Sequence, residues 1–508
     1  MFVRTPFRSL AAAALFAAGA HVASCAVKLP GLLSSHMVLQ RDRPIHVWGW
    51  SDPGEKITVE LHGVSRAAVG SDLGTWSVYL PPERAGGPYR LTVSAKNEII
   101  LEDVLIGDVW FASGQSNMEM PLKGFTGAPL KDSEQEIAHA NQPELRLINF
   151  PKKAIDFPQR NIDASWTACT PETAANFSAA AYFFGRDLNS HEHVPIGLID
   201  ATWGGTPAEA WVSLEAISRD AALMPIFATR AQMMQSQADA ALIAAAERRE
   251  DEAARQAGKT PPPHPWRPDP ASWAPAWLFN GMVAPATAYG IKGVIWYQGE
   301  SNSRLAFAPM YARIFPALIA DWRAQWQEGD FPFLFVQISS FKSNASEVWA
   351  VIREAQRRTL EVANTAMVVT TDIGDPDNVH PADKQTVGAR LALAARALVY
   401  GEHVEYAGPI FRQAAAQSEG IRVWFDHTGR GLAARGDELQ GFEIAGSDGR
   451  FVPATARIDG NTVVVSSGQV ADPKYVRYGW ANAPVINLFN GDGLPASPFT
   501  SEEAIPPK

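Results

Sequence analysis

The stretch Val104-Leu-Ile-Gly-Asp-Val-Trp-Phe111 is a short apolar run, and Gly114-Gln-Ser-Asn-Met118 follows it closely. Apolar runs of this length are typical of strands that are buried on both faces of a parallel sheet. Four later runs share this character, at residues 194–202, 293–297, 333–338 and 367–371. Helical patterns lie between the runs, for example at residues 178–188 and 311–322. The alternation predicts an α/β domain with a doubly wound parallel sheet of five strands.

The segments on either side of this α/β region show strand patterns. Short alternating strands with intervening turns predict a small β-sandwich before residue 105, with strands at residues 45–50, 56–62, 76–80 and 89–94. After residue 400, strands are expected at residues 422–425, 439–445 and 462–466. The length of 508 residues suits two to four domains. We expect an export segment at 1–26, an N-terminal β-rich domain at 27–105, the α/β domain at 106–400 and a C-terminal β-rich region at 401–508.

An insertion interrupts the α/β domain at about residues 225–272. Residues 233–257 are rich in Ala, Gln, Glu and Arg, which predicts an exposed helix. Residues 261–270 are rich in proline, which predicts a stiff linker.

Residues 1–26 have the features of an export signal. Arg4 and Arg8 precede an apolar stretch at residues 10–20, and cleavage is expected after Ala26. As an alternative, Val22-Ala-Ser-Cys25 is similar to the lipobox of bacterial lipoproteins, in which the cysteine is lipidated. Both interpretations predict an exported protein, periplasmic or secreted. No later apolar run reaches the roughly 20 residues that a membrane span needs.

The composition excludes several classes of protein. The chain has 44 Lys and Arg against 54 Asp and Glu, a formal net charge of −10, so it lacks the basic footprint of a general nucleic-acid binder. Its two cysteines, Cys25 and Cys169, exclude a disulfide scaffold and a cysteine-ligated zinc framework. Because Cys25 lies in the export segment, Cys169 has no partner and is expected to be buried.

Polar and glycine residues follow the predicted strands where each strand ends, and ligands bind at that edge of an open α/β sheet. Four groups stand there: Gly114-Gln-Ser-Asn-Met118, Trp203-Gly-Gly-Thr206, Gln298-Gly-Glu-Ser-Asn302 and Asp372-Ile-Gly-Asp-Pro-Asp-Asn-Val-His380. A serine, a glycine pair, an amide cluster and an Asp/His cluster on one rim are the parts of an acyl-transfer site.

The chemistry of acyl transfer explains these residue types. A serine hydroxyl such as that of Ser116 needs a base, and histidine titrates near neutrality, which suits His380. A carboxylate must orient the imidazole, and Asp377 is three residues from His380, whereas Asp372 and Asp375 are less compactly spaced rivals. Fixed donors must stabilise the oxyanion. Metal chemistry is a weaker alternative, because neither residues 191–193 nor the aspartates at 372–377 have complete ligand spacing.

These groups resemble the four blocks of the SGNH hydrolase superfamily, and most closely its sialate O-acetylesterase family of carbohydrate esterases. The similar segments also include Met37-Val-Leu-Gln40, Trp48-Gly-Trp50, Leu278-Phe-Asn-Gly-Met282 and Ile352-Arg-Glu-Ala-Gln356, and they extend over nearly the whole mature chain. The resemblance implies a three-layer α/β/α esterase domain with β-rich flanks. It implies Ser116 as nucleophile, His380 as base and Asp377 as its partner.

The resemblance also implies an oxyanion hole made by the N–H groups of Ser116 and of Gly204 or Gly205. The superfamily commonly adds an Asn from a Gly-x-Asn-Asp block; this chain has Gln298-Gly-Glu300 instead, and we expect the Gln298 amide to serve. Trp203 and Trp296 are candidates to stack on a sugar, and Glu300 and Asn302 are further substrate-binding candidates. Most of the 16 tryptophans are expected in cores.

The resulting hypothesis is a serine esterase that removes O-acetyl groups from carbohydrates through an acetyl-enzyme on Ser116, without a metal or other cofactor. O-acetylated sialic acid and plant polysaccharides such as xylan or xyloglucan are both open as substrates. A non-catalytic carbohydrate-binding protein is the alternative of another class, and the complete Ser/Asp/His set argues against it.

Overall fold

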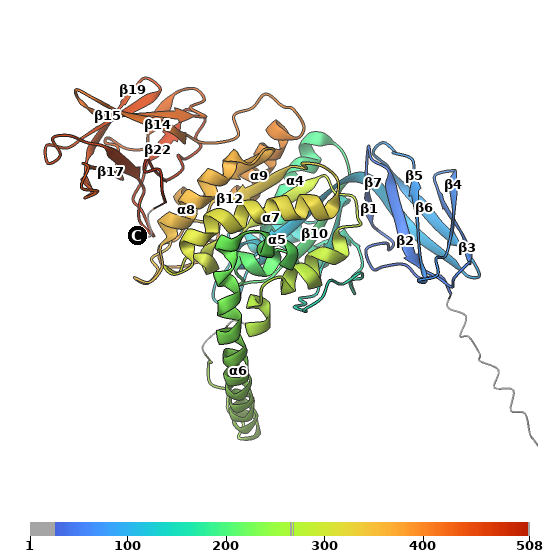
Figure 1. Cartoon of the computed structure of the whole chain (residues 1–508). Helices are drawn as coiled ribbons and strands as arrows, with labels where there is room; N and C mark the ends of the chain where they lie inside the picture. The colour runs from blue at the N-terminus through green and yellow to red at the C-terminus, as the bar shows by residue number, and fades with distance from the viewer. Residues whose placement is uncertain (1–25, 265–266, 268, 506–508) are drawn as a thin grey trace, which may run out of the picture.

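The computed structural model describes residues 26–264, 267 and 269–505. The predicted export segment, apart from Ala26, lies outside these residues, and so does Cys25. Figure 1 shows a central α/β part between two β-rich parts, with the N-terminal one in blue and the C-terminal one in red.

The central sheet contains all five of the strands expected from the apolar runs. Its strand order is β13 (Thr365–Val368), β12 (Phe333–Val336), β11 (Gly293–Tyr297), β7 (Glu98–Gly114), β10 (Ile196–Thr202), β8 (Gln142–Asn149) and β9 (Thr167–Cys169). Neighbours from β13 to β8 are parallel, and β9 is antiparallel. The expected count of five parallel strands is therefore wrong, because β8 adds a sixth. Its first half is polar and includes Pro143, which concealed the strand pattern.

Strand β7 belongs to two parts of the molecule. Its first half pairs with β6 (Gly86–Ser94) of the N-terminal part, and its second half pairs with β10 and β11. Exposure along β7 changes accordingly, from an exposed Glu98 to unbroken burial from Val104 to Gly114. The predicted domain limit at residue 105 thus falls inside one continuous strand.

Helices cover both faces of the central sheet. Two neighbouring side chains of β7 show this: Trp110 packs on Phe184 of α4 (Ala179–Glu192), whereas Phe111 packs on Trp322 of α7 (Tyr311–Trp326). Helix α9 (Lys384–Leu398) lies beside α4, and α8 (Trp349–Arg358) lies beside α7. The central part therefore has three layers, helix on sheet on helix.

The N-terminal part is built from short antiparallel strands. They are β2 (Ile45–Trp50), β3 (Lys56–Leu61), β4 (Val64–Val69) and β5 (Thr75–Leu80), with β1 (Val38–Gln40) added parallel to β7. Burial alternates along β2 and β3, as the sequence pattern predicts.

The C-terminal part has its own hydrophobic core, formed by side chains between Ile421 and Phe499. Its strands are β14 (Ile410–Gln417), β15 (Gly420–Asp426), β16 (Leu432–Ala434), β17 (Phe442–Ala445), β18 (Val452–Pro453), β19 (Thr455–Asp459), β20 (Thr462–Ser466), β21 (Tyr475–Tyr478), β22 (Leu488–Asn490) and β23 (Phe499–Thr500). They form two four-stranded antiparallel sheets and one pair.

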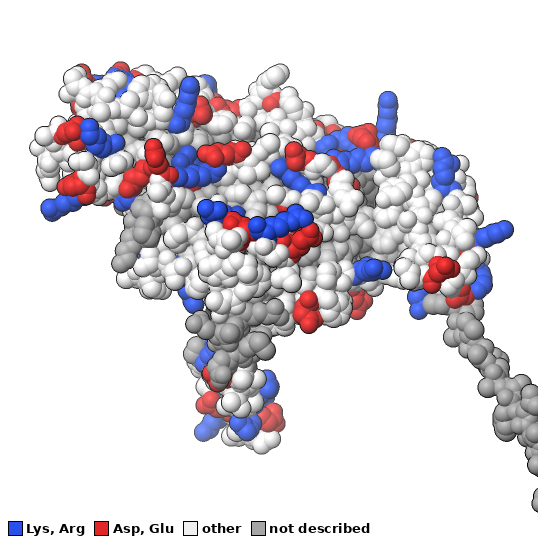
Figure 2. Space-filling view, in the orientation of Figure 1, with Lys and Arg blue, Asp and Glu red and all other residues white. Residues whose placement is uncertain are grey.

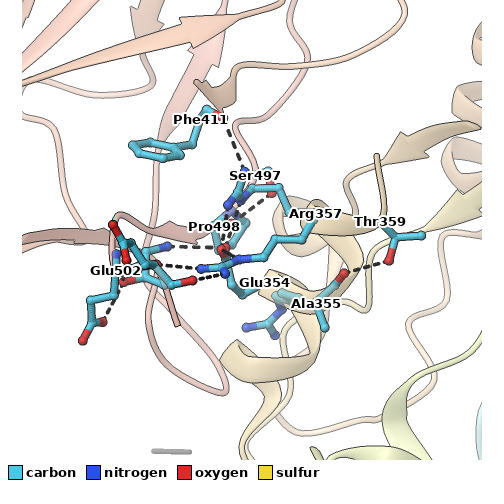
Figure 3. Close-up of polar contacts among 12 residues, drawn as sticks. Glu354, Ala355, Arg357, Thr359, Phe411, Ser497, Pro498 and Glu502 are labelled. Carbon is cyan, nitrogen blue, oxygen red and sulfur yellow. Dashed lines mark hydrogen bonds and ion pairs between the residues drawn. The ribbon is translucent and has the colours of Figure 1, made fainter. Parts of the chain in front are cut away.

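Helix α8 joins the central part to the C-terminal part. Its buried Glu354 accepts from Arg357 at 2.6 and 2.9 Å (Figure 3). The Thr500 N–H donates to the same carboxylate at 3.4 Å. Arg357 also donates to the Phe411 carbonyl at 3.4 Å. A buried carboxylate needs such partners, so Glu354 acts as a structural tie between the two parts.

The remaining helices are short except α6. They are α1 (Ser116–Glu119), α2 (Ser133–Ala138), α3 (Pro171–Ala174), α5 (Leu214–Arg219) and α6 (Pro225–Gln256). Helix α6 contains most of the helix that the insertion predicts, begins earlier at Pro225, and projects away from the central part (Figure 1).

Basic and acidic side chains are interspersed on the face in Figure 2, without a basic band. None of the helices in the described part of the chain combines the length and the apolar character that a membrane span requires.

Candidate active site

A pocket of about 760 Å³ lies at the carboxyl ends of the central strands. Ser116 follows β7, Gly204 and Gly205 follow β10, and Glu300 follows β11; His380 is on the loop after β13, and all five line the pocket. The fold therefore brings four motif loops, far apart in sequence, to one cavity. This location agrees with the general position of ligand sites in open α/β sheets.

The backbone around Ser116 is shaped by a glycine. Gly114 has a φ of +136°, and a Cβ there would lie 2.2 Å from the Tyr297 carbonyl oxygen, so only glycine fits. The chain turns there from β7 into α1, whose first residue is Ser116. The Ser116 N–H and hydroxyl form no hydrogen bond with other described residues. The turn thus presents a free hydroxyl and a free N–H to the pocket.

The predicted oxyanion donors are only partly available. The Gly204 N–H donates to the Glu119 carboxylate, whereas the Gly205 N–H has no hydrogen-bond partner among the described residues. A Cβ at Gly204 would lie 3.1 Å from Ser116 Cβ, so a side chain there would crowd the serine.

Gln298 does not take the position expected of an oxyanion donor. It is fully buried and does not line the pocket. Its amide donates to Thr206 O at 3.2 Å and to Asn302 Oδ1 at 2.6 Å, and its Oε1 accepts from Tyr311 at 3.0 Å. Because both amide hydrogens are used, the structure does not support the expected contact with an oxyanion.

His380 lies half-buried in the pocket wall, with its ring against Phe125 at 5.2 Å between centroids. Burial, reinforced by the positive charge of Lys384, lowers the pKa of His380 to about 4. The imidazole is therefore neutral at pH 7 and able to accept a proton. Its ring forms no hydrogen bond with another described residue.

Asp377 is not paired with His380 in this structure. Its side chain is 80% exposed and forms an ion pair with Lys342 at 3.1 Å. The spacing of three residues does not bring the side chains together because residues 374–383 form turns rather than a helix. The rival Asp372 is also engaged, in an ion pair with Arg390 at 2.7 Å.

Glu300 is one of the acidic residues that line the pocket, and it is nearly fully buried. It is 8% exposed, and burial raises its pKa. Its Oε1 accepts from Asn117 Nδ2 at 2.6 Å, whereas its Oε2 is buried without a hydrogen-bond partner among the described residues. The Asn117 amide also contacts Val379 O and Lys384.

The predicted substrate contacts divide into two groups. Trp203 lines the pocket, with Lys152 Nζ 5.9 Å from its ring centroid. Trp296 is fully buried against Trp211 and Trp322, so its expected contact with a sugar is wrong and it is a core residue. Asn302 is also buried away from the pocket; it accepts from the Ala208 N–H at 2.9 Å.

Several pocket residues were not expected from the sequence. The pocket lining also includes the aromatic residues Phe125, Trp273, Phe341 and Trp349. Gln115 Oε1 accepts from the N–H groups of Gly299 and Ser301, which ties the serine loop to the Glu300 loop. The position of Gln115 and Asn117 on either side of Ser116 is the one sequence signal that pointed to them.

Arg353 and Gln356 have structural contacts. Arg353 is fully buried and donates to the carbonyls of Ile338, Ser339, Ala481 and Asn482, and burial lowers its pKa to about 9. Gln356 bonds to Gln298 O and to the Ile338 N–H.

Neither a metal cluster nor a reactive thiol is present in the part of the chain that the structure describes. No group of three His, Cys, Asp or Glu side chains there is placed to hold a metal ion. Cys169 is buried, and burial raises the pKa of its thiol to about 12, as expected of an inert cysteine.

Comparisons with known proteins point to one family of enzymes. Residues 266–397 match the family model described as carbohydrate esterase, sialic acid-specific acetylesterase. The sialate O-acetylesterase of Rattus norvegicus is 29% identical over 92% of this chain and 93% of its own length. That of Pongo abelii is 32% identical over 74% of this chain and 72% of its own length.

A solved structure extends the similarity to the whole architecture. The crystal structure of a carbohydrate acetylesterase from Xanthomonas citri is 38% identical, with a TM-score of 0.81, over 94% of this chain and 100% of that one. The similarity therefore includes both β-rich parts as well as the central part. The chain belongs to the sialate O-acetylesterase family, and it is a carboxylic ester hydrolase that removes O-acetyl groups from carbohydrates.

Proposed function

We propose that Ser116 is the nucleophile and His380 the general base of this esterase. Ser116 Oγ attacks the acetyl carbonyl carbon while His380 takes the hydroxyl proton; His380 then gives that proton to the departing sugar hydroxyl, which leaves an acetyl group on Ser116. Water next attacks the acetyl-enzyme, again losing its proton to His380, and acetate leaves as Ser116 regains its proton. The observation that carries this proposal is the convergence of Ser116, His380 and Gly205 on one pocket.

Glu300 rather than Asp377 is the carboxylate proposed to support His380. Its Oε2 is buried in the pocket without a hydrogen-bond partner among the described residues, and such an oxygen is costly unless it accepts a hydrogen bond. An imidazole N–H is the kind of donor that satisfies it. The exposed carboxylate of Asp377 has no such need.

The N–H groups of Ser116 and Gly205 are the proposed oxyanion donors. Both are free of other hydrogen bonds among the described residues, unlike the Gly204 N–H and the Gln298 amide. Fixed backbone donors cost no reorganisation when charge develops.

O-acetylated sialic acid is the proposed substrate. The named relatives support it, and so does the pocket cation Arg304. Arg304 forms no ion pair with the described residues, and its guanidinium lies 5.4 Å from the centroid of the Trp273 ring. A cation beside an aromatic face fits a sugar ring that has a carboxylate.

Acetate release tests the proposal. Wild type, Ser116→Ala and His380→Ala are assayed on 9-O-acetyl sialic acid, acetylated xylan and acetylated xyloglucan. Ser301→Ala is the matched control, because Ser301 is a second serine in the same pocket. Loss of turnover in both Ser116→Ala and His380→Ala, with Ser301→Ala still active, supports the assignment, and an active Ser116→Ala would contradict it. Turnover restricted to an acetylated neutral polysaccharide would refute the substrate.

Arg304→Met tests the carboxylate contact separately. We expect a higher KM for the sialic acid ester and an unchanged KM for 4-nitrophenyl acetate, which has no carboxylate. Equal effects on both esters would contradict the proposed contact.

The N-terminal segment supports a proposal of export. Arg4, Arg8 and the apolar residues 10–20 have the pattern of a signal that is removed on secretion. The mass of the mature protein from a producing cell separates cleavage after Ala26 from lipidation at Cys25. A mature protein that keeps residues 1–26 unmodified would contradict both.

A further inference from the structure

A fully buried amide beside the nucleophile connects three loops of the site. Asn117 directly follows Ser116 and is inaccessible to solvent. Its Nδ2 donates to Glu300 Oε1 at 2.6 Å and to Val379 O at 3.0 Å, and its Oδ1 accepts from Lys384 Nζ at 2.6 Å. Val379 precedes His380. One side chain thus bonds the serine segment to the loops of Glu300 and His380.

The partners of Asn117 determine which way its amide faces. The Lys384 ammonium can only donate, whereas the Glu300 carboxylate and the Val379 carbonyl accept. If the amide were flipped, its NH₂ would face the ammonium and its oxygen would face two other oxygens. With Lys384 in place, one orientation satisfies all three partners.

Local helix stability does not account for a lysine at position 384. The residue is 1% exposed and begins α9, where the positive end of the helix disfavours a cation. The Asp383 carboxylate does not hydrogen-bond the ammonium, because it caps Thr386 at 2.9 and 3.0 Å. The charged or titratable groups that face Lys384 are Glu300, His380, Asp383 and Tyr297, whose ring centroid lies 5.6 Å from Nζ. Burial lowers the pKa of Lys384 to about 7, so the site is a costly place for this side chain.

We propose that Lys384 is a positioning residue for deacetylation: by donating to Asn117 Oδ1, it locks the Asn117 amide in the orientation that holds Glu300 and the Val379–His380 backbone beside Ser116. This inference rests on the proposed roles of Ser116, His380 and Glu300. Lys384 itself does not line the pocket, so it acts through Asn117 rather than on the substrate.

The experiment measures kcat, KM and Tm of the full chain with 4-nitrophenyl acetate. Lys384→Met removes the donor at similar size, and Asn117→Ala removes the amide. We expect Lys384→Met to lower kcat by about 100-fold, the cost of a small misplacement of catalytic groups, with little change in KM. The double variant should resemble Asn117→Ala alone, because the two residues act through one contact.

Arg323→Met is the matched control for removal of a buried cation. Arg323 is 8% exposed and donates to Phe331 O and Asn364 O, outside the pocket. It should lower Tm without lowering kcat. Lys384→Gln keeps a donor for Asn117 without the charge, so its kcat should exceed that of Lys384→Met; it also serves if the methionine variant does not fold.

Three results would overturn the inference. The first is a kcat for Lys384→Met near that of wild type. The second is a double variant whose loss of kcat equals the product of the two single losses. The third is a kcat for Lys384→Gln that does not exceed that of Lys384→Met. Ser116→Ala is run beside them. If it stays active, the proposed function itself fails; if it is inactive while Lys384→Met is fully active, only the role of Lys384 fails.

Discussion

Glu300→Gln should damage catalysis far more than Asp377→Asn, although Asp377 has the better sequence spacing to His380. The two carboxylates differ in environment: Glu300 is 8% exposed inside the pocket, and the Asp377 side chain is 80% exposed. A carboxylate that orients a catalytic histidine and stabilises its cation contributes through close contact in a dry site.

The magnitudes follow from these environments. Asp377 contacts Lys342, whose side chain is 66% exposed, and such surface pairs contribute about 0–1 kcal/mol. Loss of that ion pair should therefore change kcat by less than about fivefold. Replacing the carboxylate partner of the base in a serine protease lowers kcat by about 10⁴-fold, which corresponds to about 5.5 kcal/mol. We expect Glu300→Gln to approach that loss.

Steady-state acetate release from 9-O-acetyl sialic acid at pH 7 measures the two effects, with Tm recorded for each variant. Lys342→Met is the matched control, because it removes the other half of the surface ion pair. The reasoning is refuted if Asp377→Asn is as inactive as Ser116→Ala while Glu300→Gln keeps most of its kcat. That result would mean that the loop of Asp377 closes over His380 when substrate binds.

Three further expectations concern pH, the tryptophans and the link to the C-terminal part. A protonated imidazole cannot act as a base, and the pKa of His380 is lowered to about 4, so the acid limb of kcat/KM should lie near pH 4. A pH–rate series tests this, and an acid limb near pH 6.5 would contradict it. Trp203→Ala should raise KM with little change in stability. Trp296→Ala should instead lower the free energy of unfolding by about 3–5 kcal/mol, measured by urea titration. A raised KM for Trp296→Ala with unchanged stability would place Trp296 in the substrate site. Glu354→Gln leaves Arg357 and Arg358 without their buried partner and should cost about 3–5 kcal/mol, measured by calorimetry; an unchanged Tm would show that the tie is not structural.

The strands of the central sheet could be predicted because their signal is local. A run such as residues 293–297 is apolar throughout and forms β11 with the same limits. Strand β8 was not predicted because only its second half is buried, and a half-polar segment shows no clear hydrophobic periodicity. The continuity of β7 through two parts of the fold also escaped, since turn and strand signals do not say which sheet a strand joins.

The sequence predicted which loops form the site, but not which side chains pair with one another there. Ser116 stands just after β7 and His380 lies on the loop that follows β13, and strand order brings those strand ends together. Asp377 illustrates the limit, because a three-residue spacing brings side chains together only in a helical turn, and the chain forms other turns there. Lys384 carried no sequence signal, since its partner Asn117 is 267 residues away.

The amide residues of the motifs show why neighbouring positions in one motif have different roles. Gln115, Asn117 and Gln298 each use their side chains for bonds between motif loops. The donors and acceptor of the Asn117 and Gln298 amides are all satisfied inside the protein, so these two amides have nothing left for a substrate. Breaking those bonds to serve a substrate would leave unpaired polar groups. Pocket side chains that have no hydrogen-bond partner among the described residues, such as the hydroxyl of Ser116 and the ring of His380, are available for chemistry. In this fold, therefore, the hydrogen bonds that a motif side chain forms within the protein distinguish the residues that build the site from those that act in it.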